Sequence, residues 1–263
     1  MTMNTRIAVT NRTICYELYK QAGLASAEDT PPTCLSRQIR VLLNNNSYDK
    51  ILVREKDLSE EEYHEFIADI FSAQHSYPAA INLTSNIIVH NFPAVAEEFG
   101  TDLHLPFSMF TNLLGHSGNS TQNNFQNFLS NSSVLTSDTS VVTSDNDLTH
   151  GSTIAFTATS SDSYRRKYPH IKRIGTSIHS VDDAVFAESH GADYITAGHI
   201  FTTDCKKGLP GRGIDWLKSI CSAVSIPVYA IGGISEANVL KLSDCNIAGY
   251  CMMSASMQPI LSK

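Results

Sequence analysis

The sequence has few charged residues and lacks the patterns of several protein classes. Only 17% of its 263 residues are Asp, Glu, Lys or Arg, and the formal net charge is −7. This acidic balance argues against a broad basic surface for nucleic acid. No stretch approaches the 18 or more apolar residues of a membrane span, and the opening residues "MTMNTRIAVTNR" lack the apolar segment of a signal peptide. We therefore expect a cytoplasmic protein that binds neither nucleic acid nor membrane.

Cysteine and histidine patterns for metal binding are also missing. Six cysteines are scattered along the chain without CxxC spacing, and the ten histidines form neither an HxH nor an HExxH motif. A long chain without a secretion signal is expected to keep its thiols reduced, several of them buried. The sequence therefore predicts neither a disulfide framework nor a zinc site.

Short apolar runs alternate with helical patterns, which is typical of βα repeats. Eight such runs predict eight strands, and a closed (β/α)8 barrel in a single domain spanning residues 1–263 is the first interpretation. A doubly wound sheet is the alternative, because strand counts from sequence can miss by one or two. The predicted strands are 6–11, 50–56, 78–84, 102–106, 173–179, 194–200, 227–233 and 248–254.

Residues 111–163 interrupt this alternation between the fourth and fifth predicted strands. The segment contains 28 Ser, Thr or Asn among 53 residues and has no Lys or Arg. Its composition favours a disordered or loosely packed insertion, and a small lid over the site is the alternative.

The end of the seventh strand carries a glycine pair. Gly232 and Gly233 in "IGGI" precede a predicted helix that begins "SEANV", and Ser254 closes the eighth strand. Glycines let the backbone approach an anion, and a helix N-terminus offers free N–H groups. Because the loops after strands seven and eight form the usual phosphate site of such barrels, we predict phosphate binding by these three residues. The alternative is a tight turn without a ligand.

Three charged residues end the second strand, in "REK". The alternation of side chains along a strand places Arg54 and Lys56 on one side and Glu55 on the other. This geometry predicts that Arg54 or Lys56 points into the cleft, whereas the alternatives are a solvated face or an internal Arg–Glu pair.

A histidine ends the fifth strand, in "TSIHS". His179 shares a strand face with Ser177, and an imidazole is suited to proton transfer. His104 and His199 compete with it for the role of acid and base, and a structural histidine is a further alternative.

Four motifs together resemble the thiamine phosphate synthase/TenI family. They are "LVREKDLSEEEY", "IGTSIHSVDDAVFAESHGADYITAGHIFTTDCKKG", "IPVYAIGGISEANV" and the "MMSAS" near the C-terminus. The resemblance covers nearly the whole chain except the 111–163 insertion. It implies a (β/α)8 barrel that binds a thiazole phosphate.

The resemblance also implies a choice between two reactions. A thiamine phosphate synthase joins a pyrimidine pyrophosphate to the thiazole phosphate with Mg²⁺ held by aspartates. The resemblance puts Leu83, in "INL", at the first of these positions and Met109 at the second, and Leu52 replaces a usual glutamine. Leu and Met supply none of the oxygen ligands that Mg²⁺ prefers. These departures favour the TenI-like thiazole tautomerases, which need neither metal nor other cofactor.

The tautomerase branch implies a role for each matching residue. His179 would be the acid and base, Gly232, Gly233 and Ser254 would hold phosphate, and Lys56 and Ser177 would line the cleft. Thr203, Cys205 and Lys206 match the loop that closes over the ligand, and Cys205 is not expected to act as a nucleophile. The first hypothesis is therefore an isomerase of thiamine biosynthesis that acts on a small thiazole phosphate. The alternatives are a thiamine phosphate synthase with Mg²⁺ and a non-catalytic regulatory paralogue. Under all three hypotheses, a homo-oligomer is a possible partner arrangement.

Overall fold

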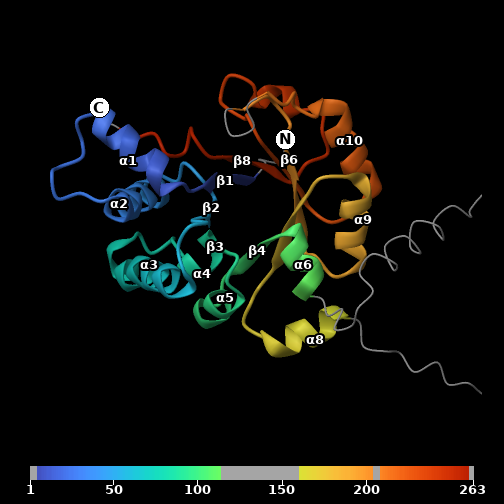
Figure 1. Cartoon of the computed structure of the whole chain (residues 1–263), viewed down its shortest axis with the longest axis horizontal. Helices are drawn as coiled ribbons and strands as arrows, with labels where there is room; N and C mark the ends of the chain where they lie inside the picture. Colours follow the sequence, from blue (N-terminus) through green and yellow to red (C-terminus); the bar gives the residue numbers. More distant parts are fainter. Residues whose placement is uncertain (1–4, 114–159, 204–207, 261–263) are drawn as a thin grey trace, which may run out of the picture.

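Eight parallel strands close into a barrel in the computed structural model, which describes residues 5–113, 160–203 and 208–260 (Figure 1). Each strand pairs with the next along the chain, and β8 pairs with β1, with Ile7 opposite Cys251. The (β/α)8 prediction is therefore confirmed. The strands are β1 Thr5–Val9, β2 Lys50–Val53, β3 Ile87–His90, β4 Asp102–Pro106, β5 Ile174–Ile178, β6 Tyr194–Gly198, β7 Val228–Ile231 and β8 Gly249–Met252.

The third predicted strand, 78–84, was wrong. The Asn82 side chain accepts a hydrogen bond from the Thr84 N–H and starts the short helix α4 (Leu83–Asn86). This local cap competes with an extended backbone. The strand is the next apolar run, "IIVH", which is buried at all four positions. The residues at its carboxyl end are therefore Asn91 and Phe92, so Leu83 is not the residue that follows the strand.

Helices surround the barrel, and two of them begin at a capping serine (Figure 1). Ser59 caps α3 in a reciprocal capping box with Glu62, and Ser180 caps α9. The helix α1 was not predicted, and its N-cap is Asn11. The remaining bounds are α1 Arg12–Gln21, α2 Pro31–Asn44, α3 Glu60–Ser72, η1 Ala73–Ser76, α5 Pro93–Phe99, α6 Phe107–Leu113, α8 Ser160–Lys167, α9 Val181–Ser189, α10 Gly213–Ala223 and η3 Val239–Leu242.

Two apolar clusters build the core. The larger one lies between the strands and the helices, and the smaller one fills the inside of the barrel. The smaller cluster consists of alternate strand residues, as expected when every second side chain faces the axis. Its buried members are Ile7, Val9, Leu52, Ile88, Tyr194, Tyr229 and Cys251.

A buried carboxylate lies at the amino ends of the strands. Asp102 is 2% exposed, and its Oδ2 is 2.9 Å from Lys50 Nζ and 2.7 Å from Arg173 Nη2. The Arg173 guanidinium also lies over the Tyr194 ring, 5.4 Å from its centroid. The interior of the barrel therefore ends in an ion-paired layer at the face opposite the expected site.

Three further expectations from the sequence concern the insertion, the cysteines and membrane spans. Most of the 111–163 insertion lies outside the described residues, which resume at α8. The five cysteines within the described ranges are free, and Cys15, Cys34, Cys245 and Cys251 are buried. None of the described helices combines the length and the apolar character needed to cross a membrane.

Candidate functional site

Polar side chains from β2 to β6 meet inside the barrel, towards the carboxyl ends of these strands. The alternation that points Leu52 and Ile88 into the barrel also points Arg54 and His90 there, two residues further on. His104, Ser177 and Thr196 join them from β4, β5 and β6. We call these five residues the mouth network.

Hydrogen bonds connect three strands within the mouth network. His104 Nε2 is 2.9 Å from Ser177 Oγ and 3.4 Å from Thr196 Oγ1. The Thr196 hydroxyl donates to Ser177 Oγ at 3.1 Å. Ser177 therefore lies where the sequence predicted, beside an imidazole, but that imidazole belongs to His104.

Burial holds both imidazoles of the mouth network in the neutral form. His90 is 4% exposed and His104 is 3% exposed. Burial is the main cause that lowers the pKa of each to about 3, and the positive charge of Arg54 contributes to the shift of both. At neutral pH these side chains are thus polar but uncharged.

Acid should destabilise the fold through these two histidines. Their pKa is below that of an unfolded histidine, so the unfolded chain binds more protons between about pH 6.5 and about pH 3. Stability is present above pH 6.5 and should fall by about 1.4 kcal/mol per pH unit for each imidazole as pH drops through that window. Urea unfolding at pH 7 and pH 5 measures the slope. A His104→Gln variant with an unchanged slope would contradict this account.

The strand end "REK" has the predicted alternation. Glu55 is 4% exposed and accepts hydrogen bonds from the Thr10 hydroxyl at 2.6 Å and from the Arg12 N–H at 3.1 Å. Burial raises the pKa of Glu55, although both hydrogen bonds oppose this. Arg54 and Lys56 face the other way, towards His90, and the Arg54 charge lowers the pKa of the exposed Lys56. Two cations thus lie beside the neutral imidazoles.

His179 lies at the rim. It follows β5, its ring is exposed, and its backbone N–H donates to Asp183 Oδ2 at 2.8 Å. Asp183 belongs to the first turn of α9. The sequence placed His179 at the end of the fifth strand beside Ser177, but β5 ends at Ile178, so His179 lies just past the strand, and Ser177 is bonded to His104 and Thr196 instead.

The turn after β7 has no helix to support an anion. The predicted helix beginning "SEANV" was wrong, because only the 3₁₀ helix η3 (Val239–Leu242) follows. The Ser235 N–H is bound by Asn238 Oδ1 at 2.9 Å, and this local bond replaces the first turn of a helix. Gly232 and Gly233 have φ values of +104° and +66°. Ser254 is exposed at the end of β8, so phosphate binding by these three residues stays a prediction.

Gly232 is also required by packing. A Cβ there would lie 2.7 Å from His199 Cα, because the loop after β6 crosses close to the turn. We expect Gly232→Ala to lower the free energy of unfolding by about 1–3 kcal/mol more than the same change at an equally strained but open position, because the added methyl group overpacks the contact with His199. Gly208→Ala is the matched control, since its φ is +81° but nothing lies within 4 Å of its Cβ. Urea unfolding compares them, and equal losses would contradict the packing argument.

The loop after β6 is described only at its two ends. Thr203 is half-buried, and Cys205 and Lys206 lie outside the described residues. His199, the first residue of the loop, has a φ of +67°, which is uncommon for a residue other than glycine. Its carbonyl accepts the Arg212 N–H at 2.8 Å, which joins the two ends of the loop.

The described residues do not fit a Mg²⁺ site. With β3 placed at Ile87–His90, the residue after Asn91 is Phe92, and Met109 lies on α6 after β4. Within the described ranges, no three His, Cys, Asp or Glu side chains are grouped to hold a metal ion. Correcting the strand therefore removes Leu83 from the end of the third strand, which carries Asn91 and Phe92 instead, and Met109 supplies no oxygen ligand at the second position.

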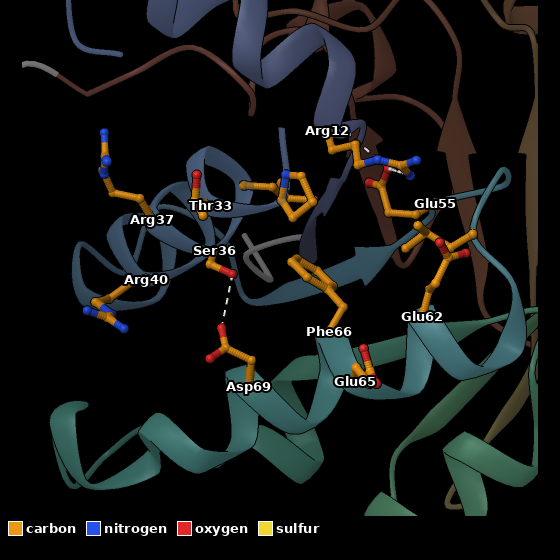
Figure 2. Close-up of a pocket in the computed structure, with 13 residues that line it drawn as sticks. Arg12, Thr33, Ser36, Arg37, Arg40, Glu55, Glu62, Glu65, Phe66 and Asp69 are labelled. Atoms are coloured by element: carbon orange, nitrogen blue, oxygen red, sulfur yellow. Dashed lines mark hydrogen bonds and ion pairs between the residues drawn. The ribbon is translucent and has the colours of Figure 1, made fainter. Parts of the chain in front are cut away.

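A cleft of about 640 Å³ lies elsewhere, between α2 and α3 (Figure 2). Figure 2 shows Ser36 on α2 bonded across it to Asp69 on α3, at 3.2 Å, with Phe66 nearby. Glu55 and Arg12 border one end. None of the predicted site residues lines this cleft, so the barrel mouth is the better candidate for chemistry.

Three residues of the mouth were not singled out from the sequence. His90 and Thr196 face the barrel interior, and Asn91 follows β3 with a left-handed φ of +75°. The misplaced third strand concealed His90 and Asn91. A non-glycine residue with positive φ at a strand end is a recurrent feature of functional sites, but the sequence does not reveal it.

Comparison with known proteins gives a partial match. The family model described as thiamine monophosphate synthase matches residues 154–256. The thiamine-phosphate synthase of Clostridium tetani is 46% identical over 83 residues, which are 32% of this chain and 40% of that protein. The Pyrococcus horikoshii thiamine-phosphate synthase is 44% identical over 84 residues, 32% of this chain and 41% of that protein. The chain thus matches about two fifths of the length of these relatives.

Among solved structures, thiamine phosphate pyrophosphorylase from Pyrococcus furiosus aligns with a TM-score of 0.57 and 20% identity, over 97% of this chain and 88% of that one. KGPDC from Streptococcus mutans aligns with a TM-score of 0.52 and 9% identity, over 98% and 91%. Both likenesses show the barrel fold alone. The sequence matches support the thiamine phosphate synthase/TenI family and do not single out its tautomerase branch.

Proposed function

We propose that this chain is a transferase of thiamine biosynthesis that joins a pyrimidine pyrophosphate to a thiazole phosphate. The observation that carries the proposal is the identity of 46% and 44% to relatives that are both named thiamine-phosphate synthase. This choice reverses the preference for an isomerase that the sequence motifs suggested. In the reaction, the thiazole nitrogen forms a bond to the methylene carbon of the pyrimidine while pyrophosphate leaves.

The mouth offers groups suited to both parts of such a ligand. Arg54 and Lys56 lie together on one side and would attract the pyrophosphate charge. The neutral imidazoles of His90 and His104 lie beside them and would face an uncharged ring. Since the described residues do not fit Mg²⁺, we derive no step through a metal.

Arg54→Ala should weaken the binding of the pyrimidine pyrophosphate. A hydrogen bond to a charged group contributes about 1.5–3 kcal/mol, so the dissociation constant should rise roughly 10- to 100-fold. Arg37→Ala is the control, because Arg37 is an arginine of the cleft between α2 and α3, away from the mouth. Titration calorimetry with the pyrimidine pyrophosphate alone measures both. Equal affinity in the two variants would exclude Arg54 from the site.

A second candidate is the thiazole tautomerase reaction, and one observation favours it. Met109, on α6, occupies the second position at which the family resemblance implies a metal-binding aspartate. An isomerisation needs one acid and base and neither a metal nor a leaving group. His179 is its proposed catalytic group, as the resemblance implies.

One pair of assays separates the candidates. The purified chain is incubated with pyrimidine pyrophosphate and thiazole phosphate, with Mg²⁺ or with a chelator, and thiamine phosphate is measured by its fluorescent oxidation product. A parallel reaction follows the aromatisation of the carboxythiazole phosphate by ultraviolet absorbance. Thiamine phosphate formation supports the proposal. Aromatisation alone would replace it by the isomerase, and binding without either reaction would indicate the regulatory paralogue.

A further inference from the structure

Three buried polar atoms on β3, on β4 and on the residue after β3 have no hydrogen-bond partner among the described residues. They are His90 Nδ1, Asn91 Oδ1 and His104 Nδ1. A buried polar atom without a partner costs about 1–3 kcal/mol, and most such atoms in folded proteins are satisfied. Because all three belong to residues that pair directly between two neighbouring strands, they point to a shared hydrogen-bonding partner.

Strand pairing brings these residues together. His90 on β3 is directly opposite His104 on β4, and the Asn91 N–H donates to the His104 carbonyl at 3.1 Å. The two imidazoles are stacked, with ring centroids 6.3 Å apart and an interplanar angle of 23°. On its other face the His104 ring stacks on Tyr194 at 5.7 Å. The His104 ring is thus stacked with the rings of His90 and Tyr194.

The hydroxyls bonded to His104 Nε2 bear on which tautomer of the ring is present. Thr196 donates its hydroxyl hydrogen to Ser177 Oγ, which leaves the Ser177 hydrogen available to His104 Nε2 at 2.9 Å. When Nε2 accepts that hydrogen, the neutral imidazole carries its own hydrogen on Nδ1. His104 Nδ1 is then a buried donor, and Asn91, whose N–H donates to the His104 carbonyl, carries a buried acceptor, Oδ1.

We propose that His90 is a positioning residue that acts through His104, and that one ordered water joins His104 Nδ1–H to His90 Nδ1 and Asn91 Oδ1. A buried water typically makes two to four hydrogen bonds to groups that are otherwise unsatisfied, and this site offers three. The water accepts from His104 and donates to His90 and Asn91. The bridge fixes the Nδ1–H tautomer of His104 and so keeps Nε2 turned towards Ser177.

The charges that face the pair are consistent with a neutral bridge. Arg54 and Lys56 are the charged groups acting on His90, and Arg54 acts on His104. Both are cations, so they disfavour a positive charge on either imidazole. The inference deepens the proposed function and rests on it for its role in the reaction, because Ser177 and His104 belong to the proposed substrate site.

Nitrogen NMR of the ligand-free protein tests the bridge without any activity. With ¹⁵N-labelled histidine, His104 should show a protonated Nδ1 and an unprotonated Nε2 at pH 7, assigned by the loss of its signals in His104→Gln. A cross-peak between water and the His104 Nδ1 hydrogen is also expected. An Nε2–H tautomer, or the absence of the water cross-peak, would overturn the proposal.

Variants at His90 then test its positioning role. His90→Phe keeps a ring in the stack but removes the acceptor, so the single-tautomer pattern of His104 should be lost. His90→Gln keeps an acceptor and should restore the single tautomer of His104. His75→Phe, at an exposed position, should leave the His104 signals unchanged. An unchanged His104 tautomer in folded His90→Phe would refute the role. Failure of the proposed function leaves these spectra unaffected, so the two results are distinguishable.

Discussion

Replacing Asp102 by alanine should lower the free energy of unfolding by about 3–5 kcal/mol, because it leaves two partly buried cations without their carboxylate partner. Asp102 Oδ2 binds both Lys50 and Arg173, at 2.9 and 2.7 Å, and the carboxylate is 2% exposed. Burial already lowers the pKa of Lys50, which shows that its charge is poorly solvated. Urea unfolding at pH 7 measures the loss.

A surface pair provides the control for this change. Glu17 and Lys20 are about half exposed and 3.5 Å apart, so Glu17→Ala should cost no more than about 1 kcal/mol. Adding Lys50→Met to Asp102→Ala removes one of the two stranded charges and should restore part of the stability. Equal effects of Asp102→Ala and Glu17→Ala would show that the layer contributes no more than a surface contact.

For the second candidate function, the tautomerase, His179→Asn should reduce the aromatisation of the carboxythiazole phosphate about 10²- to 10⁴-fold, the usual contribution of a positioned acid and base. The substitution is local, because the side chain is exposed and the bond to Asp183 comes from the backbone N–H. Formation of thiamine phosphate by the same variant should change little, since that transfer requires no proton to be moved by this side chain. The variant thus assigns His179 to one of the two reactions.

The exposed His75 is the matched control for this experiment, and His75→Asn should keep the full rate. An unchanged aromatisation rate in His179→Asn, with the fold intact by circular dichroism, would remove the residue from the mechanism. His104 would then be the next histidine to test, since it is bonded to Ser177 in the mouth.

The fold follows from the sequence because buried parallel strands are continuous apolar runs between capped helices. Seven of the eight strands lie where those runs predict them. The third was misplaced because "PAAINLT" is apolar as well, whereas Asn82 turns it into a helix cap. The predicted helix after β7 was wrong for a related reason, since the Asn238 side chain accepts the Ser235 N–H and replaces the first helical turn. Short side-chain-to-backbone bonds outweighed periodicity in both cases.

The site was predicted less completely than the fold. The alternation of side chains along "REK" was sufficient to place Glu55 on a different side of the strand from Arg54 and Lys56. The partner of Ser177 was not predictable, because His104 lies 73 residues away and reaches it only through the pairing of β4 with β5. The buried state of His90 depends on the same closed topology. Contacts between strands, rather than residue types, decide which histidines meet.

The side chain of Tyr63 joins the helical layer to the barrel. It is fully buried on α3, donates its hydroxyl hydrogen to the Val53 carbonyl at 2.6 Å and accepts the His90 N–H at 3.0 Å. Phe66, one turn further along α3, lines the cleft of Figure 2. Tyr63 therefore links α3, which forms one wall of the outer cleft, to the carboxyl ends of β2 and β3 at the barrel mouth.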